Sequence, residues 1–548
     1  MDSGGMDSGT EHGGTERGGA PRPGGQLPVS RSGLGLDRRR FLVCAAGLTL
    51  GLTTACDTGP RSAHDSGPTP SGTDRAPTRP GWLAAEQARP GDADWRIRSV
   101  GPPDAIAGYT DRAAVLPGEE CGLHVSTTAP GFRVSAYRVG WYGGAQARLV
   151  WRSDHTAGQS HGAQRVVPGT RTVQADWPRT LALPTGSWPP GAYLLRLDAD
   201  HGHQRYVPLV VRSPSATGAT VLMHAPATWQ AYNTWGGASL YQGDDGAYAT
   251  RSLAVSFDRP YDADGAEKFL VYERAVVVLA ERLGIPLAYT TGIDVHQAPS
   301  TLDGATAVLS LGHDEYWTPE QRDHVTRARD AGTNVAFLGA NACFRRVRLT
   351  PGANGTARTV TCYKTDYRAD PYLATHPDRP TNDFRQAPAA APESALTGVL
   401  YEGFPTDAPY VVHNPDHWLY EGTGVRRGDS FDHLVGVEYD RVTPGMPTPG
   451  ELEIVAHSPL VCNGRDSHAD SAYYTVPSGA GVFASGTMRW AEALMAGTSD
   501  NGRNHGMDAR TGAFVTRTTE NLLRAFAEGP AARTRPAPRN NIRDVYDT

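Results

Sequence analysis

The sequence has little net charge, almost no lysine and, beyond residue 56, no apolar run long enough to cross a membrane. Its formal net charge is −6 over 548 residues, so no strong overall field attracts nucleic acid or acidic lipid. Of its 52 basic residues only Lys268 and Lys364 are lysines, a bias that we interpret as a habit of base composition. The sequence therefore predicts a water-soluble globular protein with more than one domain.

Cysteines are few and irregularly spaced. Two of the six, Cys44 and Cys56, belong to an N-terminal leader. The others follow no zinc-binding pattern: Cys121, Cys343, Cys362 and Cys462. Cys343 and Cys362 flank a predicted hairpin, which favours a disulfide in an oxidising compartment. Cys343 lacks the tight Gly-x-Cys-x-Gly turn of a nucleophile, so we expect it to have a structural role.

The N-terminal segment, residues 1–56, is predicted to be a disordered start followed by an export signal. Residues 38–42 have the Arg-Arg-x-Phe-Leu order of a twin-arginine signal, and a short apolar run follows. Thr53-Thr54-Ala55-Cys56 resembles a lipoprotein cleavage box in which Thr53 replaces the usual leucine. The protein is therefore expected outside the cytoplasm, either released or lipidated at Cys56. It would contact a membrane only through the signal or the lipid.

Two domains are predicted beyond a flexible linker at 57–84. Residues 85–214 alternate apolar and polar positions over short runs separated by turn residues, a pattern typical of an antiparallel β-sandwich. Residues 215–528 mix buried-strand runs with helical patterns and predict an α/β domain. Residues 529–548 are rich in proline and arginine and predict a loose tail.

The second domain is expected to contain a doubly wound parallel sheet. Runs at 220–223, 307–311 and 334–338 have the composition of buried strands. One apolar helical face extends over 266–283, and residues 318–321 provide an N-cap, a proline and a capping-box glutamine for a further helix. Strands that alternate with helices in this way form parallel sheets through right-handed crossovers.

Two loops that follow predicted strands contain side chains suited to chemistry. A tyrosine- and tryptophan-rich stretch, 228–241, follows the first strand, and His313, Asp314 and Glu315 follow the second. Because sites in parallel sheets form beyond the carboxyl ends of strands, both loops should lie at one edge. From residue type alone, a packed aromatic lid and a structural histidine are the more frequent explanations.

Several segments in and around these loops match a known family. They are Trp229–Tyr241, Gly312–Trp317, Phe257–Pro260, Asn341–Cys343, Cys362–Lys364, His417–Trp418 and Gly486–Trp490. They resemble the large (beta) subunit family of N,N-dimethylformamidase, and the upstream run Tyr137–Gly144 is similar to exported relatives. The resemblance implies an Ig-like β-sandwich followed by an α/β domain similar to class I amidotransferase-like folds.

The resemblance also implies a mononuclear iron site built from two tyrosines and a glutamate. Carried over by motif, Tyr232 and Tyr241 would provide phenolate ligands and Glu315 the carboxylate. Tyr261 is the alternative to Tyr241. His313 would be the general acid and base. Phenolate and carboxylate oxygens are hard anionic donors that suit ferric iron (Fe3+).

The expected reaction is hydrolysis of a C–N bond in a small amide. A bound cation would polarise the carbonyl and activate water, and His313 would exchange protons. We expect Asn233, Trp235 and Asp314 to contact the substrate. Zinc on His313 and Glu315 is an alternative cofactor, and a non-catalytic cell-envelope protein that binds glycan or a small molecule is an alternative function. A homo-oligomer and a separate small subunit both stay open as partners.

Overall fold

The computed structural model describes residues 81–162, 164–352, 355–498 and 505–547. They belong to a single compact unit. The twin-arginine signal, Cys56 and most of the linker lie outside the described residues. Within the described part of the chain the fold is mixed and β-rich, with several sheets. None of its helices has the length and hydropathy that a membrane span requires.

Residues 106–211 form two larger, mainly antiparallel sheets and a short hairpin of β7 (Arg165–Val167) and β8 (Thr172–Gln174). One has the order β1-β3-β9 and the other β2-β11-β10-β4-β5, with β6 beside β4. The strands are β1 (Ile106–Thr110), β2 (Ala114–Val115), β3 (Gly122–Thr127), β4 (Gly131–Val139), β5 (Ala147–Arg152), β6 (Thr156–Ala157), β9 (Leu181–Ala182), β10 (Gly191–Ala199) and β11 (Gln204–Val211). Leu123 and Val125 of the first sheet share an apolar cluster with Val134 and Leu195 of the second. The two sheets therefore form one core.

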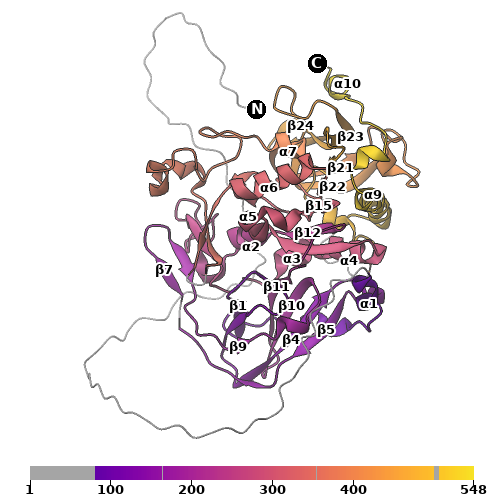
Figure 1. Cartoon of the computed structure of the whole chain (residues 1–548). Coiled ribbons are helices and arrows are strands. Elements are labelled where there is room, and N and C mark those ends of the chain that lie inside the picture. The colour runs from indigo at the N-terminus through magenta and orange to yellow at the C-terminus, as the bar shows by residue number, and fades with distance from the viewer. Residues whose placement is uncertain (1–80, 163, 353–354, 499–504, 548) are drawn as a thin grey trace, which may run out of the picture. The chain divides into compact units, whose positions relative to one another are not determined.

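Strand β10 is buried on both faces, which explains its nearly continuous apolar sequence. Tyr193 and Leu195 point into the core between the two sheets. Ala192 and Leu194 point the opposite way and join a second apolar cluster that contains helix α4 (Arg274–Leu283). Because side chains alternate along a strand, one sheet packs against both the smaller sheet and the following α/β region (Figure 1).

The largest sheet has seven strands in the order β14-β12-β15-β17-β25-β24-β23. They are β12 (Thr220–His224), β14 (Leu287–Thr291), β15 (Ala307–Ser310), β17 (Asn334–Phe337), β23 (Leu452–Cys462), β24 (Arg465–Thr475) and β25 (Gly481–Ala484). The strands from β14 to β25 run parallel. Strands β24 and β23 are added antiparallel. Strand–helix alternation therefore predicts the parallel part, and a long hairpin makes the sheet mixed.

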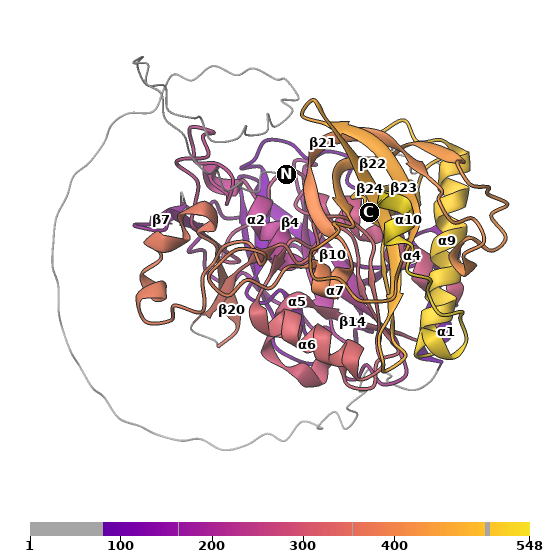
Figure 2. The same ribbon diagram turned by 90° about the horizontal axis from the view of Figure 1, so that it is seen from above.

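Helices cover both faces of this sheet. Leu222 of β12 packs in the cluster that contains α4 and α9 (Ala509–Ala527), whereas its neighbour Val221 packs in the cluster of α5 (Gly292–Gln297) and α6 (Pro319–Asp330). Figure 2 shows α5 and α6 away from α9. The N-cap predicted for α6 is present, since the Thr318 hydroxyl accepts a hydrogen bond from the Gln321 N–H at 3.0 Å.

The single helix predicted over 266–283 is two helices in the structure. Helix α3 (Glu267–Tyr272) ends where α4 begins, and Glu273 between them has non-helical φ and ψ of −125° and −37°. Its buried carboxylate accepts a hydrogen bond from the Trp229 indole at 2.7 Å and lies 2.6 Å from Nδ1 of His224. Periodicity cannot reveal this break, because both halves continue the same apolar face.

Residues 530–547 pack on the α/β region, which differs from the loose tail that their composition predicts. Ala531 is fully buried, and its N–H donates to the Asn334 side chain at 3.0 Å. The Asn541 side chain accepts a hydrogen bond from the Ile454 N–H at 2.8 Å. Helix α10 (Ile542–Tyr546) follows, and the Tyr546 hydroxyl donates to Asp470. Side-chain contacts with distant strands, which composition cannot show, hold this segment.

The predicted disulfide between Cys343 and Cys362 is wrong, since the four described cysteines are free and buried. The two thiols lie in different apolar clusters: Cys343 shares one with Trp317, and Cys362 shares the other with Tyr316, the two residues of strand β16 (Tyr316–Trp317). Burial raises the pKa of Cys343 to about 12. A neutral, buried thiol is a poor nucleophile, which fits the structural role expected for Cys343.

Candidate functional site

Two neighbouring parallel strands carry the residues expected to form the site. Strand β12 leads directly into α2 (Pro226–Tyr232), whose last residue is Tyr232. Strand β15 leads into the loop that holds His313 and Glu315. Since β12 and β15 pair in parallel, their carboxyl ends lie at the same edge of the sheet, as predicted.

Tyr232, Tyr241 and Glu315 come together in one oxygen cluster. The Tyr232 hydroxyl donates to Oε2 of Glu315 at 2.5 Å. The Tyr241 hydroxyl lies 2.8 Å from the Tyr232 hydroxyl and 2.9 Å from Oε2 of Glu315. Burial, and then the charge of Glu315, raise the pKa of both phenols well above its ordinary value. In the metal-free chain both phenols are therefore protonated and donate to the carboxylate.

The geometry distinguishes Tyr241 from Tyr261 as the second tyrosine of the cluster. Tyr261 lies beside Trp229, with ring centroids 6.3 Å apart, on the lining of a separate crevice. Tyr316, which the sequence does not single out, donates its hydroxyl to that of Tyr241 at 2.8 Å. It follows Glu315 directly, so the carboxylate and a third phenol reach the same place from adjacent positions.

His313 lies against the cluster from the same loop as Glu315. Its Nε2 is 3.6 Å from Oε2 of Glu315. Its ring centroid is 5.1 Å from that of Tyr232. Burial lowers the pKa of His313 to about 4, so the imidazole is neutral at pH 7 and able to accept a proton.

The sequence that forms this cluster lies within a segment that matches a known protein family. Residues 133–505 match the family described as N,N-dimethylformamidase beta subunit-like, C-terminal. The chain belongs to this family. The match covers more than half of the chain and includes the tyrosine and glutamate residues of the cluster. No curated protein matches the chain.

In this dimethylformamidase-like chain both lysines lie over the tyrosine rings of the cluster. The Nζ atom of Lys364 is 3.2 Å from the centroid of the Tyr241 ring, and that of Lys268 is 5.5 Å from the Tyr232 ring. Lys364 is 1% exposed, and its Nζ makes no hydrogen bond to any described residue. Burial lowers its pKa well below the ordinary value. The sequence singles out both lysines by their rarity but does not predict that they lie at the site.

Arg345 forms an ion pair with the Glu315 carboxylate. Strand β18 (Arg345–Arg346) pairs in parallel with β16, which places Arg345 opposite Tyr316. Its Nε donates to Oε1 of Glu315 at 3.2 Å, and its Nη1 pairs with Asp383. Charged neighbours of this kind fix the orientation of a ligand carboxylate. Arg345 gave no recognisable signal in the sequence.

A second buried carboxyl group, Glu438, faces the site in the dimethylformamidase-like chain. Its Oε2 accepts a hydrogen bond from Nδ2 of Asn341 at 2.8 Å. Burial, and then the charge of Glu315, raise the pKa of Glu438 well above its ordinary value. Asn341 belongs to the Asn341–Cys343 segment that carries the family resemblance, whereas Glu438 lies in a strand with no local signal. Glu438 therefore favours its protonated form in this buried site.

The residues expected to contact substrate make other contacts in the structure. The Asn233 amide donates to the Pro260 carbonyl at 2.8 Å and accepts from the Trp235 N–H at 3.0 Å. The Trp235 ring packs edge-on against Trp177, with centroids 5.7 Å apart. Asp314 accepts a hydrogen bond from the Ser310 hydroxyl at 3.0 Å, and burial raises its pKa to about 7. Their contact with substrate stays a prediction.

Proposed function

We propose that this chain is a metal-dependent hydrolase that cleaves the C–N bond of a small amide at the Tyr232–Tyr241–Glu315 cluster. Family membership supports amide hydrolysis as the chemistry. The observation that carries the proposal is the cluster itself, in which the oxygens of two phenols and one carboxylate lie 2.5 to 2.9 Å apart. A cation that displaces the two phenol protons would find three oxygen ligands already close together.

The donor set fits a hard trivalent or divalent cation. Ligand oxygens at about 2.0 Å from one octahedral ion lie about 2.9 Å from each other, close to the separations in the cluster. Among the described residues no group of three His, Cys, Asp or Glu side chains is arranged to hold a metal. This leaves zinc on His313 and Glu315 short of a third ligand of its usual kind. Iron on two phenolates and a carboxylate is therefore the better proposal.

The surrounding residues supply the rest of the reaction. A cation held by the cluster would polarise the amide carbonyl and lower the pKa of water. Neutral His313 accepts the proton of the attacking water and returns it to the leaving amine. Lys268 and Lys364 place their amino groups beside the two tyrosines, and burial favours the neutral form of Lys364. Arg345 holds Glu315 in place.

The proposal extends to the finer architecture and the location of the chain. We assign 85–214 to an Ig-like sandwich, because two sheets share one core. We assign 215–528 to an α/β domain of the class I amidotransferase-like type, because helices cover both faces of five parallel strands. Export by the twin-arginine route, lipidation at Cys56 and a small partner subunit remain proposals based on the sequence.

Metal analysis of the purified chain with a visible spectrum tests the proposal. We expect close to one iron per chain and a phenolate-to-iron absorption band, followed by amine release from small amides. Tyr241→Phe should lose the band and at least most of the metal, whereas the control Tyr261→Phe should keep both. A chain that takes up no metal on reconstitution with iron would favour a non-catalytic binding protein. Zinc in place of iron would favour the alternative hydrolase.

A further inference from the structure

The Tyr232–Tyr241–Glu315 cluster is accessible from the side of its two phenols. Tyr232 and Tyr241 are half-buried, whereas Glu315 and Tyr316 are each 1% exposed. Lys268 of helix α3 is also half-buried, and its Nζ lies 5.5 Å from the centroid of the Tyr232 ring. A molecule that approaches the cluster from solvent therefore meets the phenols and the Lys268 ammonium group together.

Lys268 has no anionic partner among the described residues. It shares the lining of a narrow crevice with Asp262 and Glu267, but its Nζ forms an ion pair with neither. The second carboxyl group of the site, Glu438, accepts its hydrogen bond from Asn341. Because a half-buried ammonium group loses part of its hydration, an anion from outside the chain would stabilise it.

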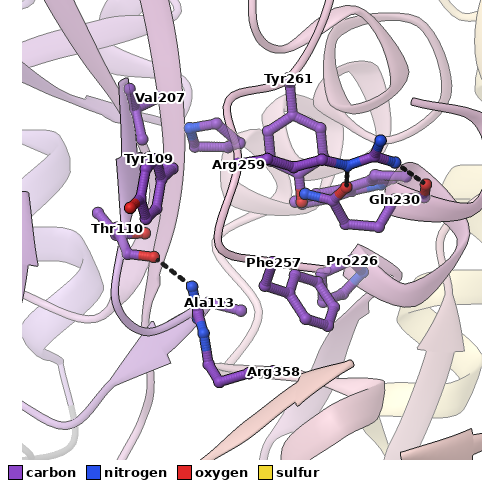
Figure 3. A pocket seen from close by; sticks show the side chains of 12 residues that line it. Tyr109, Thr110, Ala113, Val207, Pro226, Gln230, Phe257, Arg259, Tyr261 and Arg358 are labelled. Atoms are coloured by element: carbon purple, nitrogen blue, oxygen red, sulfur yellow. Dashed lines mark hydrogen bonds between the residues drawn. The ribbon is translucent and has the colours of Figure 1, made fainter. Parts of the chain in front are cut away.

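The neighbouring arginines, in contrast, are already paired. Arg345 forms ion pairs with Glu315 and Asp383. Arg358, which lines a separate crevice (Figure 3), pairs with Asp258. Each of these guanidinium charges is therefore balanced within the chain.

The proposed iron site adds no net charge of its own to the open side. Two phenolates and the Glu315 carboxylate carry three negative charges, which offset the three positive charges of Fe3+. Arg345 and Asp383 offset each other. The ammonium group of Lys268 thus remains as a positive charge beside the cluster, and it favours a substrate with one negative charge.

We propose that the amide substrate of this site carries a carboxylate group, which the ammonium group of Lys268 binds. This inference rests on the proposed amide hydrolysis and adds a substrate class to it. Small N-acyl amino acids belong to that class, since their carboxylate lies one carbon away from the amide nitrogen. Hydrolysis joins the water oxygen to the acyl carbon and breaks the C–N bond, and the nitrogen takes a proton from the water. The products are a carboxylic acid and a free amino acid.

Rates of formate release from N-formylglycine and from its neutral shape counterpart, N-isobutylformamide, test this inference on the iron-loaded chain. We expect kcat/KM to be roughly tenfold or more higher for N-formylglycine, because the neutral compound lacks the charge-assisted hydrogen bond. Lys268→Met should lower the ratio of the two kcat/KM values about tenfold, and Lys268→Arg should restore most of it. Arg282→Met, which removes a surface arginine paired with Glu520, should leave the ratio unchanged.

A binding measurement adds a readout that does not depend on turnover. Levulinate has a methylene group in place of the amide N–H of N-acetylglycine, so it cannot be hydrolysed, and 5-methylhexan-2-one is its neutral counterpart. In ligand-observed NMR titrations the chain should bind levulinate more tightly than the neutral ketone. Lys268→Met should abolish that difference.

Failure of this inference is distinguishable from failure of the proposed function. Hydrolysis of N-isobutylformamide that equals or exceeds that of N-formylglycine overturns the inference and leaves amide hydrolysis intact. The same holds for a ratio that Lys268→Met does not change. Hydrolysis of neither compound contradicts the proposed function, and levulinate binding that does not depend on Lys268 then overturns carboxylate recognition as well.

Discussion

Replacing Glu281 by glutamine should destabilise the junction between the N-terminal sheets and the α/β region. Glu281 lies on α4, is fully buried, and pairs with Arg138 of β4 at 2.5 Å. Oε1 also accepts a hydrogen bond from the Tyr289 hydroxyl at 2.5 Å, and Oε2 accepts one from the Trp141 N–H at 3.1 Å. Arg138 and Trp141 belong to the Tyr137–Gly144 segment. This network therefore gives that segment a structural role at the junction.

The expected loss of unfolding free energy is large because the substitution removes the negative charge and leaves the positive charge of Arg138 buried. Arg138 would keep the Pro190 carbonyl at 2.9 Å and the Tyr142 hydroxyl at 2.8 Å, which are neutral. Breaking a buried ion pair in this way costs about 3 to 5 kcal/mol. Replacing both members by Arg138→Met and Glu281→Gln should recover much of the loss, since neither charge is then buried without its partner.

Unfolding in urea, followed by tryptophan fluorescence, measures this prediction. Glu120→Gln is the matched control, because Glu120 and Arg179 form a pair with side chains 70% and 42% exposed. That control should cost less than about 1 kcal/mol. A Glu281→Gln midpoint no lower than that of Glu120→Gln would refute the reasoning. So would a double variant that is less stable than Glu281→Gln.

Three further predictions concern the cluster. His313→Gln should retain bound metal but lose roughly a hundredfold or more in amide hydrolysis; loss of metal together with activity would assign His313 a structural or liganding role. Iron affinity should rise about ten- to a hundredfold per pH unit between pH 6 and 8, because the two phenols release protons on binding; equilibrium dialysis that shows no pH dependence would contradict protonated phenols in the metal-free chain. Lys364→Met should stabilise the metal-free chain at pH 7 by about 1 to 3 kcal/mol. The folded-state pKa of Lys364 lies below its unfolded value, about 10.4, so folding at neutral pH opposes protonation, and the gain should shrink as the pH approaches that value. A urea midpoint at pH 7 lower than that of the parent chain would show that the Lys364 side chain stabilises the fold by more than the burial of its amino group costs.

The sequence predicts the parts of the fold that depend on neighbours along the chain. The strands at 220–223 and 307–311 and the cap at Thr318 follow from local periodicity and capping chemistry, and the structure contains them. The break at Glu273 and the packing of the C-terminal segment do not follow from it. Both depend on side chains that meet residues far away in sequence, Trp229 in one case and Asn334 in the other.

The candidate site likewise contains residues that the sequence predicts and residues that only the fold brings together. Tyr232, Tyr241, His313 and Glu315 lie in short motifs, so a resemblance between sequences finds them. Arg345 reaches Glu315 only because β18 pairs with β16, and its motif-free surroundings give no hint of this. The geometry also separates Tyr241 from Tyr261, which spacing along the chain leaves as alternatives.

The placement of the two lysines changes the meaning of the arginine bias. Base composition explains why the chain uses arginine for nearly every basic residue. It does not explain why Lys268 and Lys364 each lie over one of the two tyrosines of the cluster. Arginine has a planar, permanently charged head, whereas lysine has a compact head whose pKa falls on burial. Against such a bias, the two positions that retain lysine both lie at the cluster, and at Lys364 burial favours the neutral amine.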